Sequence, residues 1–80
     1  MQHTEIYAEN GASKICDIHN LRIQNEKRNP NGTINPTYYF FECDVRLQNY
    51  QKYYLNIDET PVKIQVIDYD PIGVVKSIKL

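Results

Sequence analysis

The chain has 80 residues, of which 41% are hydrophobic and 24% are charged, and its formal net charge is −1. This length allows one small domain over residues 1–80 with a thin core, and the average composition argues against bulk disorder. The small net charge argues against a protein that wraps duplex DNA, because such proteins carry an excess of Lys and Arg.

The sequence indicates a cytoplasmic protein. Its first ten residues include Glu5 and Glu9 and no apolar run, so we expect no signal peptide. The longest apolar block, residues 38–41, is far shorter than the roughly 20 residues of a membrane span. In the cytoplasm Cys16 and Cys43 would stay reduced. Asn, Ile, Lys and Tyr are frequent and have AT-rich codons, which indicates a low-GC genome such as that of a bacterium, a phage or an archaeal virus.

The amino-terminal part is predicted to hold a short strand, a turn and an ambiguous segment. Residues 5–8 are typical of an edge strand, and Asn10-Gly11 is typical of a turn. A second strand is favoured next. A short helix over residues 12–20 is the alternative, because four residues follow helical spacing: Ala12, Cys16, His19 and Ile23.

The strongest strand signal covers residues 37–47, where side chains alternate with a period of two. We expect one face of this strand to enter the core, namely Thr37, Tyr39, Phe41, Cys43, Val45 and Leu47. The other face would carry Tyr38, Phe40, Glu42, Asp44 and Arg46.

Two turns with Pro and Gly predict two hairpins and their registers. The first is Asn29-Pro30-Asn31-Gly32, and the second is Asp70-Pro71-Ile72-Gly73; both are typical of three-residue hairpin loops with a bulge. The first turn pairs Ile23 with Tyr39, Leu21 with Phe41, His19 with Cys43 and Ile15 with Leu47. The second turn pairs Val66 with Ile78, Ile64 with Leu80 and Asp68 with Lys76.

Residues 52–57 are predicted to form a further strand, after which residues 58–61 interrupt the chain. Tyr53, Leu55 and Ile57 would share one face of this strand. Together the elements predict an all-β fold, an antiparallel meander of five or six strands that forms a curled sheet or a small barrel.

The face opposite the predicted core is rich in aromatic residues. The first register places Arg22 beside Phe40, Gln24 beside Tyr38, Asn20 beside Glu42 and Cys16 beside Arg46. Tyr54 would join this face if its strand pairs in phase with residues 37–47. Because Tyr and Arg are enriched at interfaces, we expect a partner-binding surface made of Arg22, Tyr38, Phe40, Tyr50, Tyr54, Glu42 and Arg46. The structural alternative is that a closed barrel or the amino-terminal segment buries these aromatic rings.

These observations favour a non-catalytic module that binds another protein, such as a phage- or mobile-element-encoded inhibitor of a host protein. A single-stranded nucleic-acid binder is the first alternative, in which the rings stack bases and Arg22, Lys27 and Arg28 meet phosphates. Glu42 and Asp44 would oppose phosphate in that case. The second alternative is a structural subunit that self-associates, for example as a homodimer.

A metal site is weakly indicated. Cys16, His19, Cys43 and His3 are candidate zinc ligands, but Cys16 and His19 point to opposite faces if their segment is a strand. Carboxylate pairs that could attract calcium are better explained by turn formation: Asp58 with Glu59 and Asp68 with Asp70. We therefore assign no metal and no cofactor.

Catalytic signals are also weak. Cys43 beside His19 is the one nucleophile and base within predicted reach, with Asp17 as an orienting group. Both would lie on the core face, where burial raises the pKa of a thiol and lowers its reactivity. We therefore expect a protein that is not an enzyme.

Overall fold

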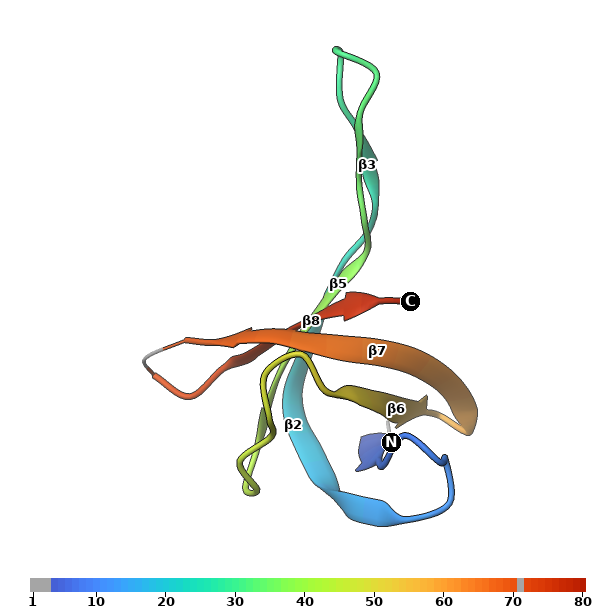
Figure 1. The fold of residues 1–80 in the computed structure, drawn as a ribbon, viewed down its shortest axis with the longest axis vertical. Helices are drawn as coiled ribbons and strands as arrows, with labels where there is room; N and C mark the ends of the chain where they lie inside the picture. Colours follow the sequence, from blue (N-terminus) through green and yellow to red (C-terminus); the bar gives the residue numbers. More distant parts are fainter. Residues whose placement is uncertain (1–3, 71) are drawn as a thin grey trace.

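Six antiparallel strands close into a barrel in the computed structural model, which describes residues 4–70 and 72–80. The barrel strands are β1 (Thr4–Tyr7), β2 (Lys14–Gln24), β5 (Tyr38–Cys43), β6 (Lys52–Ile57), β7 (Thr60–Tyr69) and β8 (Val75–Lys79). Two short strands, β3 (Lys27–Arg28) and β4 (Ile34–Asn35), form a separate ribbon that projects from the barrel as an arm (Figure 1). The all-β prediction, with a small barrel as one of its two forms, is confirmed.

The order of strands around the barrel is β1-β2-β5-β8-β7-β6, and β6 pairs back to β1. The connection from β5 to β6, residues 44–51, therefore joins strands that are not neighbours, and β8 takes the place beside β5. The expected pairing of residues 52–57 with residues 37–47 is wrong. The expectation that residues 5–8 form an edge strand is also wrong, because β1 pairs with β2 on one side and with β6 on the other, which closes the barrel.

The helical alternative over residues 12–20 is wrong, because residues 14–20 belong to β2, which pairs with both β1 and β5. The four residues at helical spacing do not form one face. Cys16 packs against the core, whereas His19 is exposed and Ile23 keeps 45% of its surface accessible. Cross-strand pairing on both sides outweighs the weak local preference for helix.

The register from the first turn holds over the outer half of the hairpin. The Asn29 amide donates to the Thr33 carbonyl oxygen at 2.8 Å, and Ile23 lies opposite Tyr39 as expected. A bulge then follows between His19 and Arg22, where Asn20 has a φ of 55°. Beyond it the pairing slips by one residue, so the expected partner of His19 (Cys43) is wrong. The expected pair of Ile15 with Leu47 is also wrong, because β5 ends at Cys43. Leu21, expected opposite Phe41, lies within the bulge, and the ladder gives it no single partner.

The bulge decides which residues of β2 enter the core. His19 now lies opposite Glu42, and Ile18, opposite Cys43, is only 4% exposed. A one-residue slip exchanges the two faces of a strand, which explains why Ile18 and Cys16 turn inward in place of His19.

The strand predicted over residues 37–47 is shorter in the structure, since β5 ends at Cys43. Val45 was expected in the core but is 43% exposed. Leu47 does reach the core from the loop, where its backbone amide donates to the Tyr69 hydroxyl oxygen. Leu47 thus contributes to the core from a loop, although the alternating pattern predicted it to lie in a strand.

In the second hairpin, as in the first, the predicted register holds next to the turn and then fails beyond a bulge. Gly73 N–H donates to the Asp70 carbonyl at 2.8 Å, Asp70 N–H donates to the Val74 carbonyl at 2.8 Å, and Asp68 lies opposite Lys76 as predicted. A bulge between Val66 and Asp68 then shifts the ladder. The predicted pairs Val66 with Ile78 and Ile64 with Leu80 are wrong; the partners are Ser77 and Lys79. Pro71 of this turn lies outside the described residues.

The strand over residues 52–57 is confirmed, and the chain break expected after it is a tight hairpin. Asp58 and Glu59 have φ values of 49° and 71°, which is typical of a two-residue type I′ turn. Ile57 therefore lies directly opposite Thr60.

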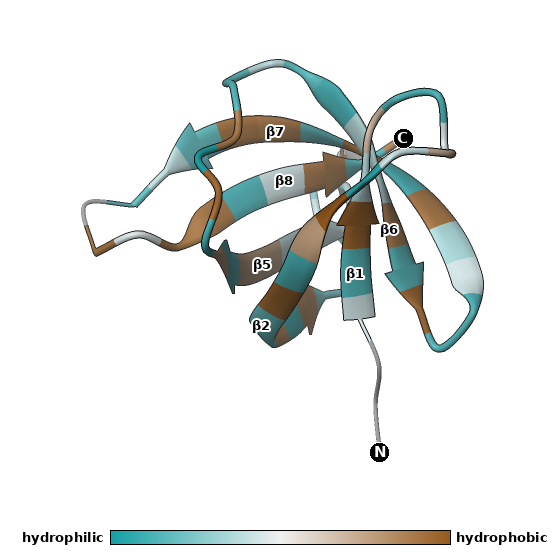
Figure 2. Cartoon of the chain, turned by 90° about the horizontal axis from the view of Figure 1, so that it is seen from below, coloured by the Kyte–Doolittle hydropathy of each residue, from teal (hydrophilic) through white to brown (hydrophobic). Residues whose placement is uncertain are grey.

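The core fills the barrel interior, and hydrophobic bands alternate with hydrophilic ones along the strands (Figure 2). Its buried apolar members are Ile6, Ile18, Tyr39, Phe41, Leu47, Tyr53, Leu55, Ile64, Val66 and Val75. Ser77 is fully buried among them and satisfies its hydroxyl by donating to the Tyr39 carbonyl at 2.9 Å.

Candidate binding face outside β2, β5 and β8

The outward side chains of β2, β5 and β8 form one surface, because Tyr39 and Phe41 point inward and their neighbours alternate outward. We call this surface the aromatic face and define it by Arg22, Tyr38, Phe40 and Lys76, with Glu42 and Asp68 at its borders. Backbone pairing aligns four of these in one row across four strands: Arg22, Phe40, Lys76 and Asp68.

Each ring of the aromatic face is half-buried and has a cation against it. The Arg22 guanidinium carbon lies 5.4 Å from the centre of the Phe40 ring, and Lys76 Nζ lies 4.8 Å from the centre of the Tyr38 ring. The two ring centres are 6.4 Å apart with planes tilted by 41°. Such contacts are attractive, so the long cationic side chains are held over the rings.

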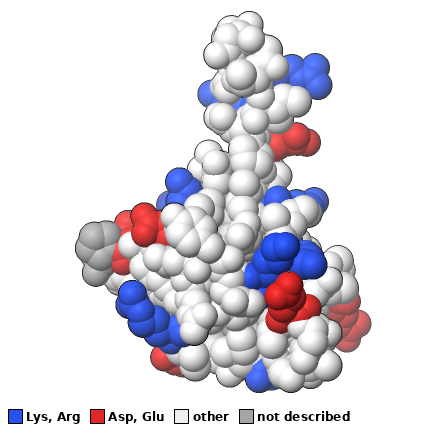
Figure 3. Space-filling view, viewed as in Figure 1, with Lys and Arg blue, Asp and Glu red and all other residues white. Residues whose placement is uncertain are grey.

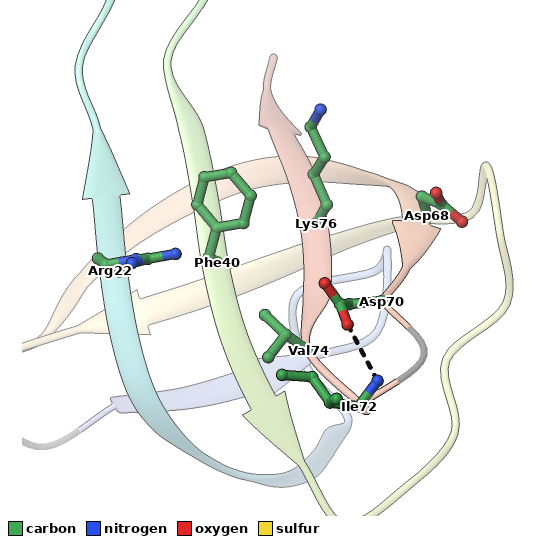
Figure 4. A pocket seen from close by; sticks show the side chains of 7 residues that line it. All are labelled: Arg22, Phe40, Asp68, Asp70, Ile72, Val74 and Lys76. Atoms are coloured by element: carbon green, nitrogen blue, oxygen red, sulfur yellow. Dashed lines mark hydrogen bonds between the residues drawn. The ribbon is translucent and has the colours of Figure 1, made fainter.

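A hollow of about 230 Å³ lies on the aromatic face. Its lining residues come from all four strands of the row and from the turn after β7: Arg22, Phe40, Asp68, Asp70, Ile72, Val74 and Lys76 (Figure 4). The Asp70 carboxylate accepts a 3.0 Å hydrogen bond from the Ile72 amide, which orders the turn at the rim. Because these side chains line one hollow, the row faces a single side of the molecule despite the curvature of the barrel.

Charges of both signs meet on this face. Two cations, Arg22 and Lys76, line the hollows there together with three carboxylates, Glu42, Asp68 and Asp70. Glu42 accepts a hydrogen bond from the Asn20 side chain, so the bulge residue also positions a border carboxylate. Over the surface seen in Figure 3, basic and acidic residues are interspersed with neutral ones.

The structure brings together four of the seven residues expected in the binding surface: Arg22, Tyr38, Phe40 and Glu42. Tyr54 lies elsewhere, on the outside of β6, opposite Tyr7 and Lys63. Lys63 Nζ lies 5.8 Å from the centre of the Tyr54 ring. The expectation that Tyr54 adjoins Phe40 is wrong because the barrel order places β8, not β6, beside β5.

Tyr50 and Arg46 belong to the loop between β5 and β6. Tyr50 is 70% exposed, and its amide donates to the Val66 carbonyl at 2.7 Å. The Arg46 guanidinium carbon lies 4.8 Å from the centre of the Tyr69 ring, in a separate hollow. Cys16, expected beside Arg46, instead pairs with Ile6 in β1.

Sequence reasoning missed Lys76, Asp68 and Val74 as members of this surface. The register of the second hairpin does place Asp68 opposite Lys76, but it does not show that β8 lies beside β5. That neighbour relation links residues 38 positions apart, Tyr39 and Ser77, and depends on closure of the barrel.

The residues considered for metal binding or catalysis are arranged differently from expectation. His19 is exposed, with Nε2 3.9 Å from Asp44 Oδ2, and it lies opposite Glu42 in the ladder. It is therefore not the base partner of Cys43. His3 lies outside the described residues. Within residues 4–70 and 72–80, no three His, Cys, Asp or Glu side chains gather closely enough to hold a metal ion.

The two cysteines are neighbours at one end of the barrel. Cys43 Sγ donates to the Val45 carbonyl at 2.8 Å, and its thiol also contacts that of Cys16. Burial, and then the Cys16 thiol, raise the pKa of Cys43 to about 11. A thiol in this environment stays protonated near neutral pH and is a poor nucleophile.

Comparison of the chain with protein families, with curated proteins and with solved structures found no match. In the described part of the chain there is no helix of the length and apolarity needed to cross a membrane.

Proposed function

We propose that the protein is a non-catalytic binding module that recognises another protein through the aromatic face. The observation that carries the proposal is the pair of half-exposed rings, Tyr38 and Phe40, each with a cation placed against it beside a hollow. Aromatic and Arg side chains dominate the binding energy of protein interfaces because they bury large areas and keep a polar end.

Preorganisation supports this proposal. The cation contacts and the strand backbone already restrict the four central side chains, so that binding costs less side-chain entropy than ordering free chains would. The border carboxylates Glu42 and Asp68 add charge complementarity, which orients a partner and raises the association rate.

A protein partner is favoured over single-stranded nucleic acid by the charges on the face. Three carboxylates stand beside the two cations, and both cations already contact rings that would have to stack bases. Nucleic-acid binders of that kind combine stacking rings with a groove of positive potential along the backbone.

Co-purification with a matched pair of variants tests the proposal. The tagged wild-type chain, Phe40→Ala and Tyr54→Ala are incubated with lysate of the source cells, with and without nuclease. Tyr54→Ala is the control, because that ring is also half-buried, is also contacted by a lysine, and lies on a different side of the barrel. Circular dichroism confirms folding of each bait.

We expect to capture a protein whose binding to the bait persists after nuclease treatment. It should bind wild type and Tyr54→Ala equally well and should not bind Phe40→Ala. Truncation of one central ring should weaken binding about 30-fold, the effect of ~2 kcal/mol at a hot spot. Capture that disappears with nuclease would replace the proposal by nucleic-acid binding. Equal loss in both variants would show that the aromatic face has no special role.

A further inference from the structure

We propose that the partner of the aromatic face is a second copy of this chain, docked face to face about a two-fold axis parallel to β5. This inference rests on the proposed function, since it names the occupant of the same surface. Two-fold dimers use one patch twice, so the patch must be complementary to its own reversed image.

The central row of the face meets this condition. Across β2, β5, β8 and β7 its chemical order is cation, ring, cation and carboxylate, supplied by Arg22, Phe40, Lys76 and Asp68. A two-fold axis between β5 and β8 reverses the order in the second copy. Arg22 then lies opposite the partner's Asp68, and Phe40 lies opposite the partner's Lys76, each contact occurring twice. All four positions of the row therefore meet an attractive group.

The adjoining row is also complementary to its own reversed order, and its groups are uncharged. It contains Gln24, Tyr38, Ile78 and Gln65, again as backbone partners across the same four strands. Reversal places Tyr38 against the partner's Ile78 in the centre and Gln24 against the partner's Gln65 at both ends. Apolar groups thus meet apolar groups, and amides meet amides.

The direction of the axis follows from the same two rows. An axis perpendicular to the strands would exchange the rows instead of reversing them. Lys76 would then lie on the partner's Ile78, and Asp68 would lie on the partner's Gln65, so no carboxylate would meet a cation. Only the axis parallel to the strands makes both rows complementary.

Gln65 Nε2 already donates to the Tyr50 carbonyl at 2.9 Å within one copy, so its amide oxygen is the group left to meet the partner's Gln24. The contacts of Lys76 and Arg22 within one copy are compatible with the dimer. Lys76 Nζ lies against its own Tyr38 ring, and the partner's Phe40 would add a second ring to the same ammonium group. Arg22 covers its own Phe40 ring and would receive the partner's Asp68 at its guanidinium edge. Ile72, which is 79% exposed at the rim, is available to extend the apolar contact.

Charge reversal at the two ends of the row provides the test. Arg22→Asp and Asp68→Arg are prepared as separate full-length proteins, and each is studied by sedimentation equilibrium over a concentration series. Both positions are exposed, and circular dichroism checks that the barrel is intact. Each variant alone would place like charges opposite each other twice, so we expect self-association on the order of 100-fold weaker than wild type.

Mixing the two variants restores the proposed contacts. In the mixed dimer, Asp at position 22 of one copy faces Arg at position 68 of the other, and the second contact keeps its natural residues. We expect the mixture, and separately the double variant Arg22→Asp/Asp68→Arg, to dimerise with near wild-type affinity. A merely unfolded or destabilised variant would not be rescued in this way.

The outcomes separate this inference from the proposed function. A wild-type chain that stays monomeric at every concentration, or a dimer that neither charge reversal weakens, would overturn the homodimer. In either case, Phe40-dependent capture of a different protein would leave the proposed function standing. Both proposals would be supported by three results together. The wild-type chain dimerises, Phe40→Ala and each single charge reversal abolish the dimer, and mixing the two charge-reversal variants restores it.

Discussion

Two outer surfaces of the barrel carry half-buried aromatic rings with a cation against them, around Phe40 and around Tyr54, and they use their other charges differently. On the side of β1, Lys14 Nζ of the neighbouring strand β2 lies 2.8 Å from Glu5 Oε2 and 3.0 Å from Asp17 Oδ1, and Glu5 is buried. These charges satisfy one another within the chain. On the aromatic face, Arg22 and Lys76 lie over rings, so that their outer sides remain available.

This difference shows how aromatic content alone can mislead. Tyr54 resembles Phe40 in exposure and in its contact with a cation. Among the described residues, both sides align cations with rings across strands beside a hollow: the row around Tyr54 is Lys14, Tyr7, Tyr54 and Lys63. The row around Phe40 differs because it ends in a carboxylate, Asp68. Charges of both signs in one row, more than the number of rings, distinguish a surface suited to recognition.

The largest effect is expected inside the barrel, and it tests whether Phe40 is truly an outer residue. Phe41→Ala should lower the free energy of unfolding by ~3–5 kcal/mol, because Phe41 is fully buried and its loss leaves a cavity. Phe40→Ala should cost about 1 kcal/mol or less, since the ring is only half-buried. Urea titration followed by tyrosine fluorescence measures both; equal losses would contradict the division of β5 into an inner and an outer face.

The next effect compares the carboxylates of the two outer surfaces. Glu5→Gln should reduce stability by ~2 kcal/mol, because it removes the charge from a nearly buried carboxylate that pairs with Lys14. Glu42→Gln, the same change at the border of the aromatic face, should cost less than ~1 kcal/mol. Thermal unfolding of the two variants measures the difference. A greater loss of stability for Glu42→Gln than for Glu5→Gln would contradict the conclusion that Glu5 stabilises the fold and that Glu42 is available to a partner.

Alkaline pH should weaken the protein, beginning at the end that holds Cys43 and Tyr69. Burial raises the pKa of both groups, that of Cys43 to about 11 from an ordinary value of 9.0. The folded chain therefore keeps protons that the unfolded chain releases, so stability is full below about pH 9 and falls as the pH rises toward 11. Glu5 and Asp17 likewise raise the pKa of Lys14, whose contribution is lost only at higher pH.

Thermal unfolding between pH 7 and pH 10.5 measures this decline, with Cys43→Ala as the control. That variant should show a shallower decline above pH 9 than wild type. An identical decline in the two proteins would show that the Cys43 thiol does not contribute to it.

The smallest effect concerns thiol reactivity. In a Cys16→Ser variant, Cys43 should react with iodoacetamide at pH 8 at least about tenfold more slowly in the folded protein than in urea, because its raised pKa keeps the thiolate scarce. Mass spectrometry of the alkylated protein follows the rate. Equal rates with and without urea would contradict the environment described for Cys43.

Local sequence signals succeeded where a turn acts on its immediate neighbours. Asn29-Pro30-Asn31-Gly32 established the pairing that continues to Arg22 and Phe40, and the second turn established the pairing of Asp68 with Lys76. Both registers failed past a bulge, at Asn20 and between Val66 and Asp68. A bulge relieves the strain of strong strand curvature, which is a property of the closed barrel and leaves little trace in alternation.

The sequence by itself determined the all-β class, the two turns, the strand over residues 52–57 and the outward pairing of Arg22 with Phe40, because these depend on contacts close along the chain or on a period of two. Only the tertiary structure decided that β8 lies beside β5, that Lys76 and Asp68 complete the row, and that Tyr54 lies on another side. Neighbour choice in a closed barrel depends on how all six strands fill one core, and no single segment carries that information.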